Sequence, residues 1–341
     1  MSKQSDSQRK LGIGIDIGTS FINSASMIND KVSIRSQRDA FFDVENDKFA
    51  RGMLKNSKTS YIVSEDDKQL YVIGQEALDF ANVFKREVRR PLRAGVISTR
   101  EPEALKMIKM ILKNVLGDPL QPGEICKFSV PAAPVDADYN VIYHENVLRS
   151  FVESFGFKAE PINEARALCY AEMSDVGFTG LGVSFGAGMV NASLVFHGSP
   201  AVEFSVSRSG DWIDENAAMA IGERVSKMTA VKEAGIDILN PKGRHEEALA
   251  IFYRNLISYV VKCFAQKLSN GSDIPEFPKP ITVVLGGGTS KPKSFDVVFK
   301  EELAKVTLPF EVAEVRLADD QMFAVAKGCL YSAISEYEEE A

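Results

Sequence analysis

Apolar stretches that predict buried strands alternate along the chain with amphipathic stretches that predict helices. Runs rich in Ile, Val and Leu, as is typical of strands, lie at 11–17, 125–130 and 281–285. Residues 21–28 complete a hairpin with the first of these runs. Apolar residues at helical spacing mark 103–116, 141–154, 165–174 and 321–334. The order hairpin, strand, helix, strand, helix occurs in both halves, which predicts an α/β chain built by duplication.

Other segments carry weaker patterns. Residues 39–90 are more polar, with short strands expected at 59–63 and 70–73, and residues 211–225 are expected to form one helix. The strongest loop signal is Asn270–Pro275, and the acidic run 336–340 is expected to be a solvated, frayed end rather than a partner-binding tail.

The clearest sign of duplication is a glycine hairpin that occurs twice. Ile15–Asn23 aligns with Val183–Asn191, so that Gly18 falls on Gly186. Such a turn favours glycine because glycine adopts positive φ and because main-chain N–H groups can then approach a ligand closely. Converging N–H groups bind anions, phosphate above all. The pair of hairpins predicts two related half-domains that hold one polyphosphate from opposite sides.

The first hairpin also carries a carboxylate. Asp16 ends its first strand, and Gly18, Thr19 and Ser20 follow. Mg²⁺ takes one or two carboxylates together with phosphate oxygens, so Asp16 is the candidate metal residue and the other three are candidate phosphate ligands. The alternative for this stretch alone is an ordinary hairpin with glycine in its turn. Its glycine spacing does not fit a dinucleotide fingerprint.

A third glycine cluster, Gly286, Gly287 and Gly288 with Thr289, follows the strand at 281–285 and precedes a helix. Without side chains a flat ring can lie against the backbone, and a helix N-terminus favours nearby negative charge. A single cluster of this kind is usually a loop. Three glycine turns, each directly after an apolar strand, point to a nucleotide.

Length, net charge and residue composition argue against several classes of function. A chain of 341 residues favours two domains, and a net charge of −7 argues against non-specific nucleic-acid binding. The first ten residues are polar and no apolar run reaches membrane-spanning length, so neither a secretory signal nor membrane contact is indicated. The four cysteines are scattered and the three histidines lack metal-ligand spacing, which favours reduced thiols and a cytoplasmic protein.

Together these motifs resemble those of the actin-like ATPases, the superfamily that actin shares with sugar kinases and large heat-shock chaperones. Ile15–Ser20 and Val183–Asn191 are similar to its two phosphate motifs, and Thr282–Ser290 to its adenosine motif. The segments similar to the bacterial actins MreB and MamK in particular are Arg90–Ser98, Ser129–Ala132 and Ser209–Glu215.

The resemblance covers residues 11–334 and implies a fold. It implies a duplicated actin-like, ribonuclease H-like α/β fold of two domains with a nucleotide cleft between the halves. Domain I would comprise 10–178 and 318–341, with a small inserted subdomain at about 35–90. Domain II would comprise 179–317, with a helical inserted subdomain at about 214–272.

The resemblance also implies a site for ATP or ADP with Mg²⁺. Glu164, with Asn163 as its neighbouring fallback, matches the residue that orients the water attacking the γ-phosphate. Without the resemblance, Glu164 would be an ordinary helix-start carboxylate. The remaining nucleotide-binding residues that it implies are Ser184, Gly186, Ala187, Gly188, Asp211, Lys232 and Glu233, the last two through a looser alignment.

One position departs from the family pattern. The second phosphate motif usually begins with Asp, and this chain has Ser184 there. The absence of this carboxylate predicts slower ATP hydrolysis, or hydrolysis that depends less on Mg²⁺.

Three functions therefore remain open. The first is an ATP-hydrolysing filament protein that assembles head to tail with itself and contacts cytoskeletal or cargo proteins. The second is a non-hydrolysing scaffold filament. The third is a small-molecule kinase, for which Asp136 and Asp138 are the candidate catalytic residues.

Overall fold

This computed structural model describes residues 9–59, 61–64, 66–84, 88–269 and 274–339. The polar N-terminal segment up to residue 8 and residues 270–273 of the predicted loop lie outside the described residues.

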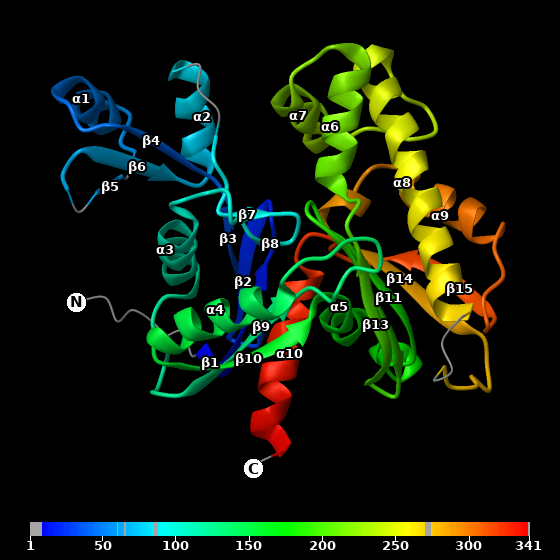
Figure 1. Cartoon of the computed structure of the whole chain (residues 1–341). Helices are drawn as coiled ribbons and strands as arrows, with labels where there is room; N and C mark the ends of the chain where they lie inside the picture. The colour runs from blue at the N-terminus through cyan, green and yellow to red at the C-terminus, as the bar shows by residue number, and fades with distance from the viewer. Residues whose placement is uncertain (1–8, 60, 65, 85–87, 270–273, 340–341) are drawn as a thin grey trace.

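Two five-stranded sheets with the same strand order form the centre of the molecule (Figure 1). In each, a three-stranded antiparallel meander continues into two parallel strands. The first has the order β10-β9-β1-β2-β3, with β1 Arg9–Ile17, β2 Phe21–Ile28, β3 Lys31–Arg38, β9 Glu124–Val130 and β10 Phe157–Asn163. The second has the order β13-β12-β11-β14-β15, with β11 Gly180–Phe185, β12 Val190–Phe196, β13 Ser199–Val206, β14 Ile281–Gly286 and β15 Val312–Leu317. The predicted duplicated α/β fold is confirmed.

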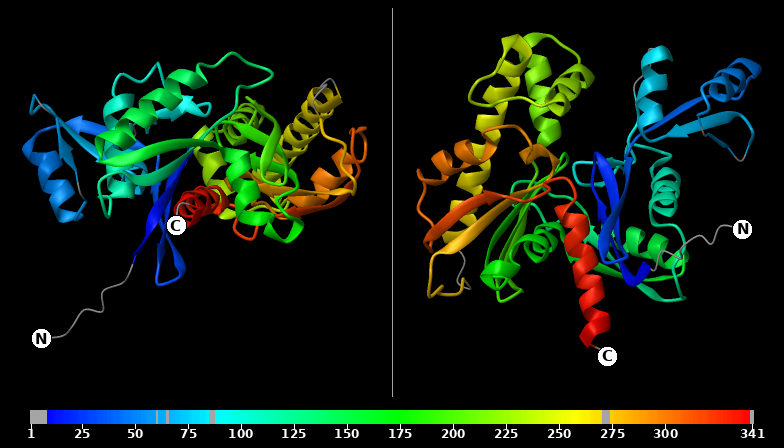
Figure 2. Two further views of the ribbon diagram at one scale, coloured as in Figure 1. Left: turned by 90° about the horizontal axis from the view of Figure 1, so that it is seen from below. Right: turned by 180° about the vertical axis from the view of Figure 1, so that it is seen from behind.

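Two helices lie between the sheets. Helix α5 (Glu164–Glu172) packs on β11 and β12, α10 (Ala324–Glu339) packs on β1 and β9, and the two helices pack against each other. Figure 2 shows α10, in red, running between the halves. The first sheet is also covered by α3 (Ala104–Leu116) and α4 (Val141–Ser154).

An arm extends from each half on the same side of the molecule (Figure 1). The first arm has its own small apolar core. It is built from β4 (Phe41–Glu45), α1 (Lys48–Asn56), β5 (Ile62–Val63), β6 (Gln69–Ile73) and α2 (Gln75–Phe84), and the short hairpin β7 (Leu92–Arg93) and β8 (Val96–Ile97) follows it. The second half adds α6 (Gly210–Ile221), α7 (Val225–Ala234), α8 (Gly243–Ser269) and α9 (Phe295–Leu303).

Two predictions about helices are wrong. The single helix expected over 211–225 is two helices, because Gly222 ends α6 in the left-handed conformation at φ 66°. The frayed end expected from 336 is instead the last turn of α10, which reaches Glu339. Lys127 of β9 pairs with Glu336, and the Tyr337 hydroxyl accepts a hydrogen bond from Ile125 N at 2.9 Å. Glu336 and Tyr337 of the acidic run therefore dock on the sheet, and residue 340 of that run lies outside the described residues.

Helix α8 is, within the described part of the chain, the one helix whose length and composition would allow it to cross a membrane. Half of its most apolar window is buried, and it packs against α6, α7 and α9. It is a core helix of the second half.

Candidate functional site

The two glycine hairpins have the same geometry. Gly18 N donates to Phe21 O at 3.1 Å, and Gly186 N donates to Met189 O at 2.9 Å. Asp16 lies opposite Asn23 across the first hairpin, and Ser184 lies opposite Asn191 across the second. The repeat seen in the sequence is thus a repeat in space.

The reason expected for glycine in these turns is partly wrong. Neither Gly18 nor Gly186 has a positive φ. A Cβ at Gly18 would lie 2.8 Å from Phe21 O, and one at Gly186 would lie 2.8 Å from Met189 O. Glycine is required because the carbonyl of the turn closes over it.

The tips of the hairpins meet at the loop between β7 and β8. Gly95 N in that loop donates to Thr19 Oγ1 at 3.1 Å. A Cβ at Gly188 would lie 2.2 Å from both Gly95 N and Thr19 Oγ1. Any side chain at Gly188 would therefore push the hairpins apart.

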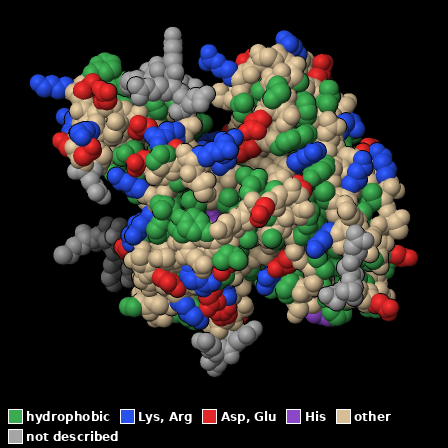
Figure 3. Space-filling view, in the orientation of Figure 1, with side chains coloured by type: hydrophobic (Ala, Val, Ile, Leu, Met, Phe, Trp, Pro, Cys, Tyr) green, Lys and Arg blue, Asp and Glu red, His purple; other side chains and the backbone are tan. Residues whose placement is uncertain are grey.

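A cavity of about 640 Å³ opens beside the hairpins, and the surface is hollowed between the two arms (Figure 3). Most of the residues predicted from the sequence line it together. They are Asp16, Gly18, Thr19, Ser20, Glu164, Ser184, Gly186, Ala187, Gly188, Lys232, Glu233, Gly287, Gly288 and Thr289.

Two of the predicted residues do not line the cavity. Gly286 ends β14 beneath α5, where a Cβ would lie 2.7 Å from Leu168 Cδ1, so its role is close packing. Asp211 begins α6, and its carboxylate accepts two hydrogen bonds from the guanidinium of Arg90, at 2.8 and 3.1 Å. It joins the first half to the second.

Two partly buried carboxylates face the cavity. Asp16 Oδ1 accepts from Ser129 Oγ at 3.0 Å, and Glu164 Oε2 accepts from Asn191 Nδ2 at 2.9 Å. Burial raises the pKa of both carboxyls, and the charge of Asp16 raises the pKa of Glu164 further. Two carboxylates that repel each other in one cavity favour a cation between them.

The fallback and kinase candidates lie elsewhere. Asn163 Oδ1 accepts from Ala165 N and Arg166 N, so its side chain caps α5 and does not line the cavity. Asp136 accepts from Ser207 N at 2.8 Å and from the Tyr259 hydroxyl at 2.7 Å, outside the cavity. Asp138 does not line the cavity either.

Lys232 and Glu233 both line the cavity but already have partners. Lys232 Nζ donates to Asp214 Oδ2 at 2.7 Å and to Gly210 O at 2.9 Å. Glu233 accepts from Arg38 at 2.6 Å. Sequence reasoning missed Asp214, although its position three residues after Asp211 places it one helical turn further along α6.

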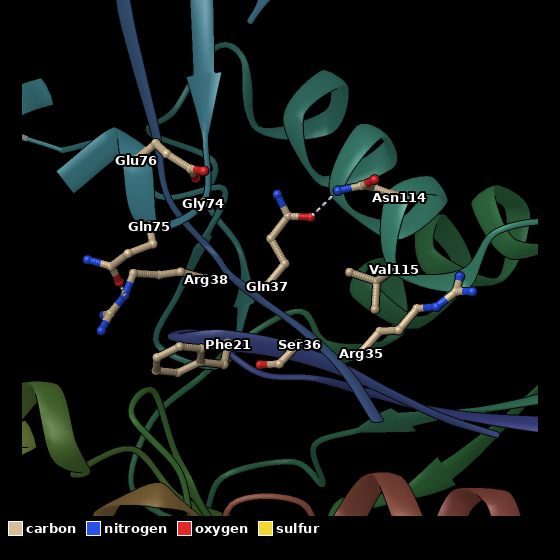
Figure 4. A pocket seen from close by; sticks show the side chains of 10 residues that line it. All are labelled: Phe21, Arg35, Ser36, Gln37, Arg38, Gly74, Gln75, Glu76, Asn114 and Val115. Atoms are coloured by element: carbon tan, nitrogen blue, oxygen red, sulfur yellow. Dashed lines mark hydrogen bonds between the residues drawn. The ribbon is translucent and has the colours of Figure 1, made fainter. Parts of the chain in front are cut away.

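A second, shallower cavity of about 440 Å³ lies between β3, the start of α2 and α3 (Figure 4). Asn114 Nδ2 donates to Gln37 Oε1 at 2.7 Å across it, and Arg38 donates to Gln75 at 3.1 Å. Its polar lining is mostly exposed, and no residue predicted for the site lies there.

Two matching sheets whose glycine hairpins face one cavity define an actin-like protein. Solved structures agree in fold over nearly the whole chain. The "MamK double helical filament" has 20% identity and a TM-score of 0.72, covering 94% of this chain and 98% of that one. MreB 5 of Spiroplasma citri bound to AMPPNP has 16% identity and a TM-score of 0.66, covering 96% and 98%. EutJ from Carboxydothermus hydrogenoformans has 14% identity and a TM-score of 0.56, covering 94% and 90%.

The family model described as Volactin matches residues 11–333. The chain belongs to the volactin family. No curated protein sequence matches it. The expected actin-like fold, similar to MreB and MamK, is confirmed.

Proposed function

We propose that this protein binds ATP with Mg²⁺ in the cavity, hydrolyses it slowly and assembles head to tail into cytoplasmic filaments. The observation that supports this most directly is that Asp16 and Glu164 share one cavity with both glycine hairpins. We also propose that the halves are domains, with 10–178 and 318–341 in one and 179–317 in the other.

The hairpins suit a triphosphate. Gly18 and Gly186 leave the turns without side chains, and Thr19 and Ser20 add hydroxyl groups. Solved relatives have been obtained with AMPPNP or ADP, in MamK and in MreB 5 of Spiroplasma citri. In this chain the flat backbone at Gly287 and Gly288 would take the nucleoside, and the hairpins would take the phosphates.

The carboxylates suit Mg²⁺. Within the described residues no group of three or more His, Cys, Asp or Glu side chains could hold a metal alone. A hard cation that takes one or two carboxylates and completes its shell with phosphate oxygens and water fits Asp16 with Glu164 nearby. The bound ion would neutralise charge on the phosphates and relieve the repulsion between the two carboxylates.

The hydrogen bond from Asn191 supports the proposed role of Glu164 in orienting a water molecule. Its Oε2 is fixed by Asn191, which leaves Oε1 to accept from a water in the cavity. Holding a water in line with the terminal phosphate is most of what such a reaction needs from the protein. Because Ser184 supplies no charge where the family pattern has Asp, turnover should be slow.

The fold that this chain shares with the MamK filament supports the proposal of filament assembly. A head-to-tail contact between identical subunits does not close on itself, so it grows a filament. The partner is a second copy of the chain, and cytoskeletal or cargo proteins would attach to the polymer.

The test is ATP-dependent sedimentation. The protein should pellet with ATP and Mg²⁺ and stay in solution with EDTA. Glu164→Gln should still pellet with ATP but release no phosphate. A wild-type protein that stays monomeric at high concentration with ATP and Mg²⁺ contradicts the filament proposal.

A non-hydrolysing scaffold is the second candidate, and Ser184 favours it. In that case phosphate release should be undetectable even in polymer, and Glu164→Gln should behave as wild type in every assay.

A further inference from the structure

Two buried polar atoms in the second half have no protein partner. Asp214 of α6 uses Oδ2 to accept from Lys232 Nζ at 2.7 Å and from Thr229 Oγ1 at 2.8 Å, and its side chain is 2% exposed. Among the residues that the structure describes, nothing bonds to its Oδ1 or to the hydroxyl of Tyr253 in α8.

Both side chains line the proposed nucleotide cavity. They belong to its part formed by α6, α7 and α8, where Thr229 and Lys232 also lie, and the phosphate hairpins form another part. Burial raises the pKa of the Tyr253 hydroxyl, and the charge of Asp214 raises it further. Both unpaired atoms therefore belong to side chains of one wall of the cavity, formed by α6 and α8.

An unpaired buried polar atom destabilises a fold, and replacing Tyr253 with Phe would remove one without leaving a large hole. Such atoms in a binding cavity are explained when a ligand pairs with them. Burial raises the pKa of the Asp214 carboxyl, whereas Lys232 and Thr229 hold the side chain in place and act in the opposite direction, toward its ionised form. An ionised carboxylate only accepts hydrogen bonds, so the group that it meets must be a donor.

We propose that Asp214, supported by Tyr253, selects the nucleoside, with Asp214 Oδ1 accepting a hydrogen bond from a donor on it. This inference rests on the proposed nucleotide binding. Three nucleoside groups offer that chemistry: the exocyclic amino group of adenine and the 2′- and 3′-hydroxyls of ribose. A site built to bond an OH or NH group discriminates strongly against an analogue without it, because the acceptor is then left unpaired.

The experiment measures the affinity of the full-length protein for five ligands with Mg²⁺: ATP, 2′-deoxy-ATP, 3′-deoxy-ATP, inosine triphosphate and inorganic triphosphate. Wild type should bind at least one of the three altered nucleotides about 10–100-fold more weakly than ATP, as expected for a hydrogen bond to a charged group. Loss with inosine triphosphate identifies the amino group, and loss with either deoxy-ATP identifies the ribose hydroxyl that it lacks. Asp214→Asn should abolish that difference and leave binding of inorganic triphosphate unchanged.

Tyr253→Phe provides an independent readout if Asp214→Asn does not fold. It should bind ATP more weakly than wild type, yet the empty variant should unfold at the same temperature or higher. The matched control is Asp136→Asn, which removes a carboxylate of the loop after β9 outside the cavity and should keep wild-type selectivity.

The outcomes separate the two proposals. If ATP binds and Asp214→Asn keeps the full wild-type selectivity, this inference fails and the proposed function stands. Wild type that binds all four nucleotides equally also overturns it. If wild type binds no nucleotide and no inorganic triphosphate, the proposed function fails and this inference fails with it.

Discussion

Asn191 fixes the position of Glu164. Its Nδ2 donates to Glu164 Oε2 at 2.9 Å, and its Oδ1 accepts from Ala132 N at 2.9 Å. Asn191 is fully buried in β12, while Ala132 follows β9 of the other sheet. One amide from the second hairpin therefore holds both the carboxylate at the start of α5 and the loop that leaves the first sheet.

Asn191→Ala should slow phosphate release by about 10–100-fold, the usual effect of removing a group that orients an active residue. ATP affinity should change less, because Asn191 does not line the cavity. Single-turnover phosphate release and equilibrium ATP binding measure the two effects. The control is Asn216→Ala, which loses a bond to Trp212 O within α6 and should keep the wild-type rate. Equal losses in binding and rate would show that Asn191 is only structural.

Ser184→Asp should make the protein depend on Mg²⁺. Ser184 is 2% exposed in the cavity that Asp16 and Glu164 share, so a new carboxylate there adds repulsion between buried charges. In EDTA the variant should unfold at a lower temperature than wild type. With ATP and Mg²⁺ most of that loss should disappear, because the cation offsets the third charge.

Ser184→Asn is the matched control, because it adds similar volume without charge. It should show no Mg²⁺-dependent gain beyond that of wild type. If Ser184→Asp responds to Mg²⁺ no more than Ser184→Asn does, the metal does not lie near this hairpin.

The sequence predicted the two sheets well because both depend on apolar strands and on a repeated turn. It did not predict α1 and α2, two short helices whose apolar residues, such as Leu54 and Ala77, pack only into the small core of the arm. The acidic run at the end of α10 was expected to lie in solvent, because nothing in its sequence indicates that Glu336 pairs with the buried Lys127 of β9.

The candidate site was predictable where a motif lies directly after a strand, as with Asp16 and Gly186. It was not predictable where tertiary contacts decide the role of a side chain. Asp211 and Asp214 occur on the same helix, yet Arg90 engages the first outside the cavity and the second is buried in its wall. Sequence spacing does not distinguish these two outcomes.

Arg38 with Glu233 and Arg90 with Asp211 are among the ion pairs that join the halves beside the cavity, and weakening them should speed nucleotide release. Arg38 bonds Glu233 at 2.6 Å, and Arg90 bonds Asp211 through both guanidinium N–H groups. Partly exposed pairs contribute about 0.2–1 kcal/mol each, so Arg38→Ala with Arg90→Ala should raise the release rate by no more than about 30-fold. Release of a fluorescent ATP analogue measures the rate.

High salt should speed release from wild type in the same direction, because it screens exposed charges. The control is Arg51→Ala, which breaks a pair with Asp67 inside the first arm. Release that is unchanged in the double variant would mean that these pairs do not hold the cleft closed.

Asp39 should make the empty protein less stable as pH rises. It is fully buried, Leu92 N donates to its Oδ2 at 3.0 Å, and within the described residues nothing bonds to its Oδ1. Burial raises its pKa to about 8, against about 3.9 for an unfolded chain. Between these values the folded state keeps a proton that the unfolded state has lost. The contribution of Asp39 to stability therefore falls as pH rises through that window and levels off above about pH 8.

Asp39→Asn keeps an acceptor for Leu92 N but cannot ionise, so it should remove this dependence. Urea unfolding at several values between pH 5 and pH 8.5, without nucleotide, gives both curves. The free energy of unfolding of Asp39→Asn minus that of wild type should increase with pH, by at most about 1.4 kcal/mol per pH unit. Taking the difference cancels the like-signed contributions of Asp16 and Glu164, which both proteins share. Parallel curves would mean that Asp39 is already ionised in the folded state, with the charge of Arg90 overcoming the effect of burial.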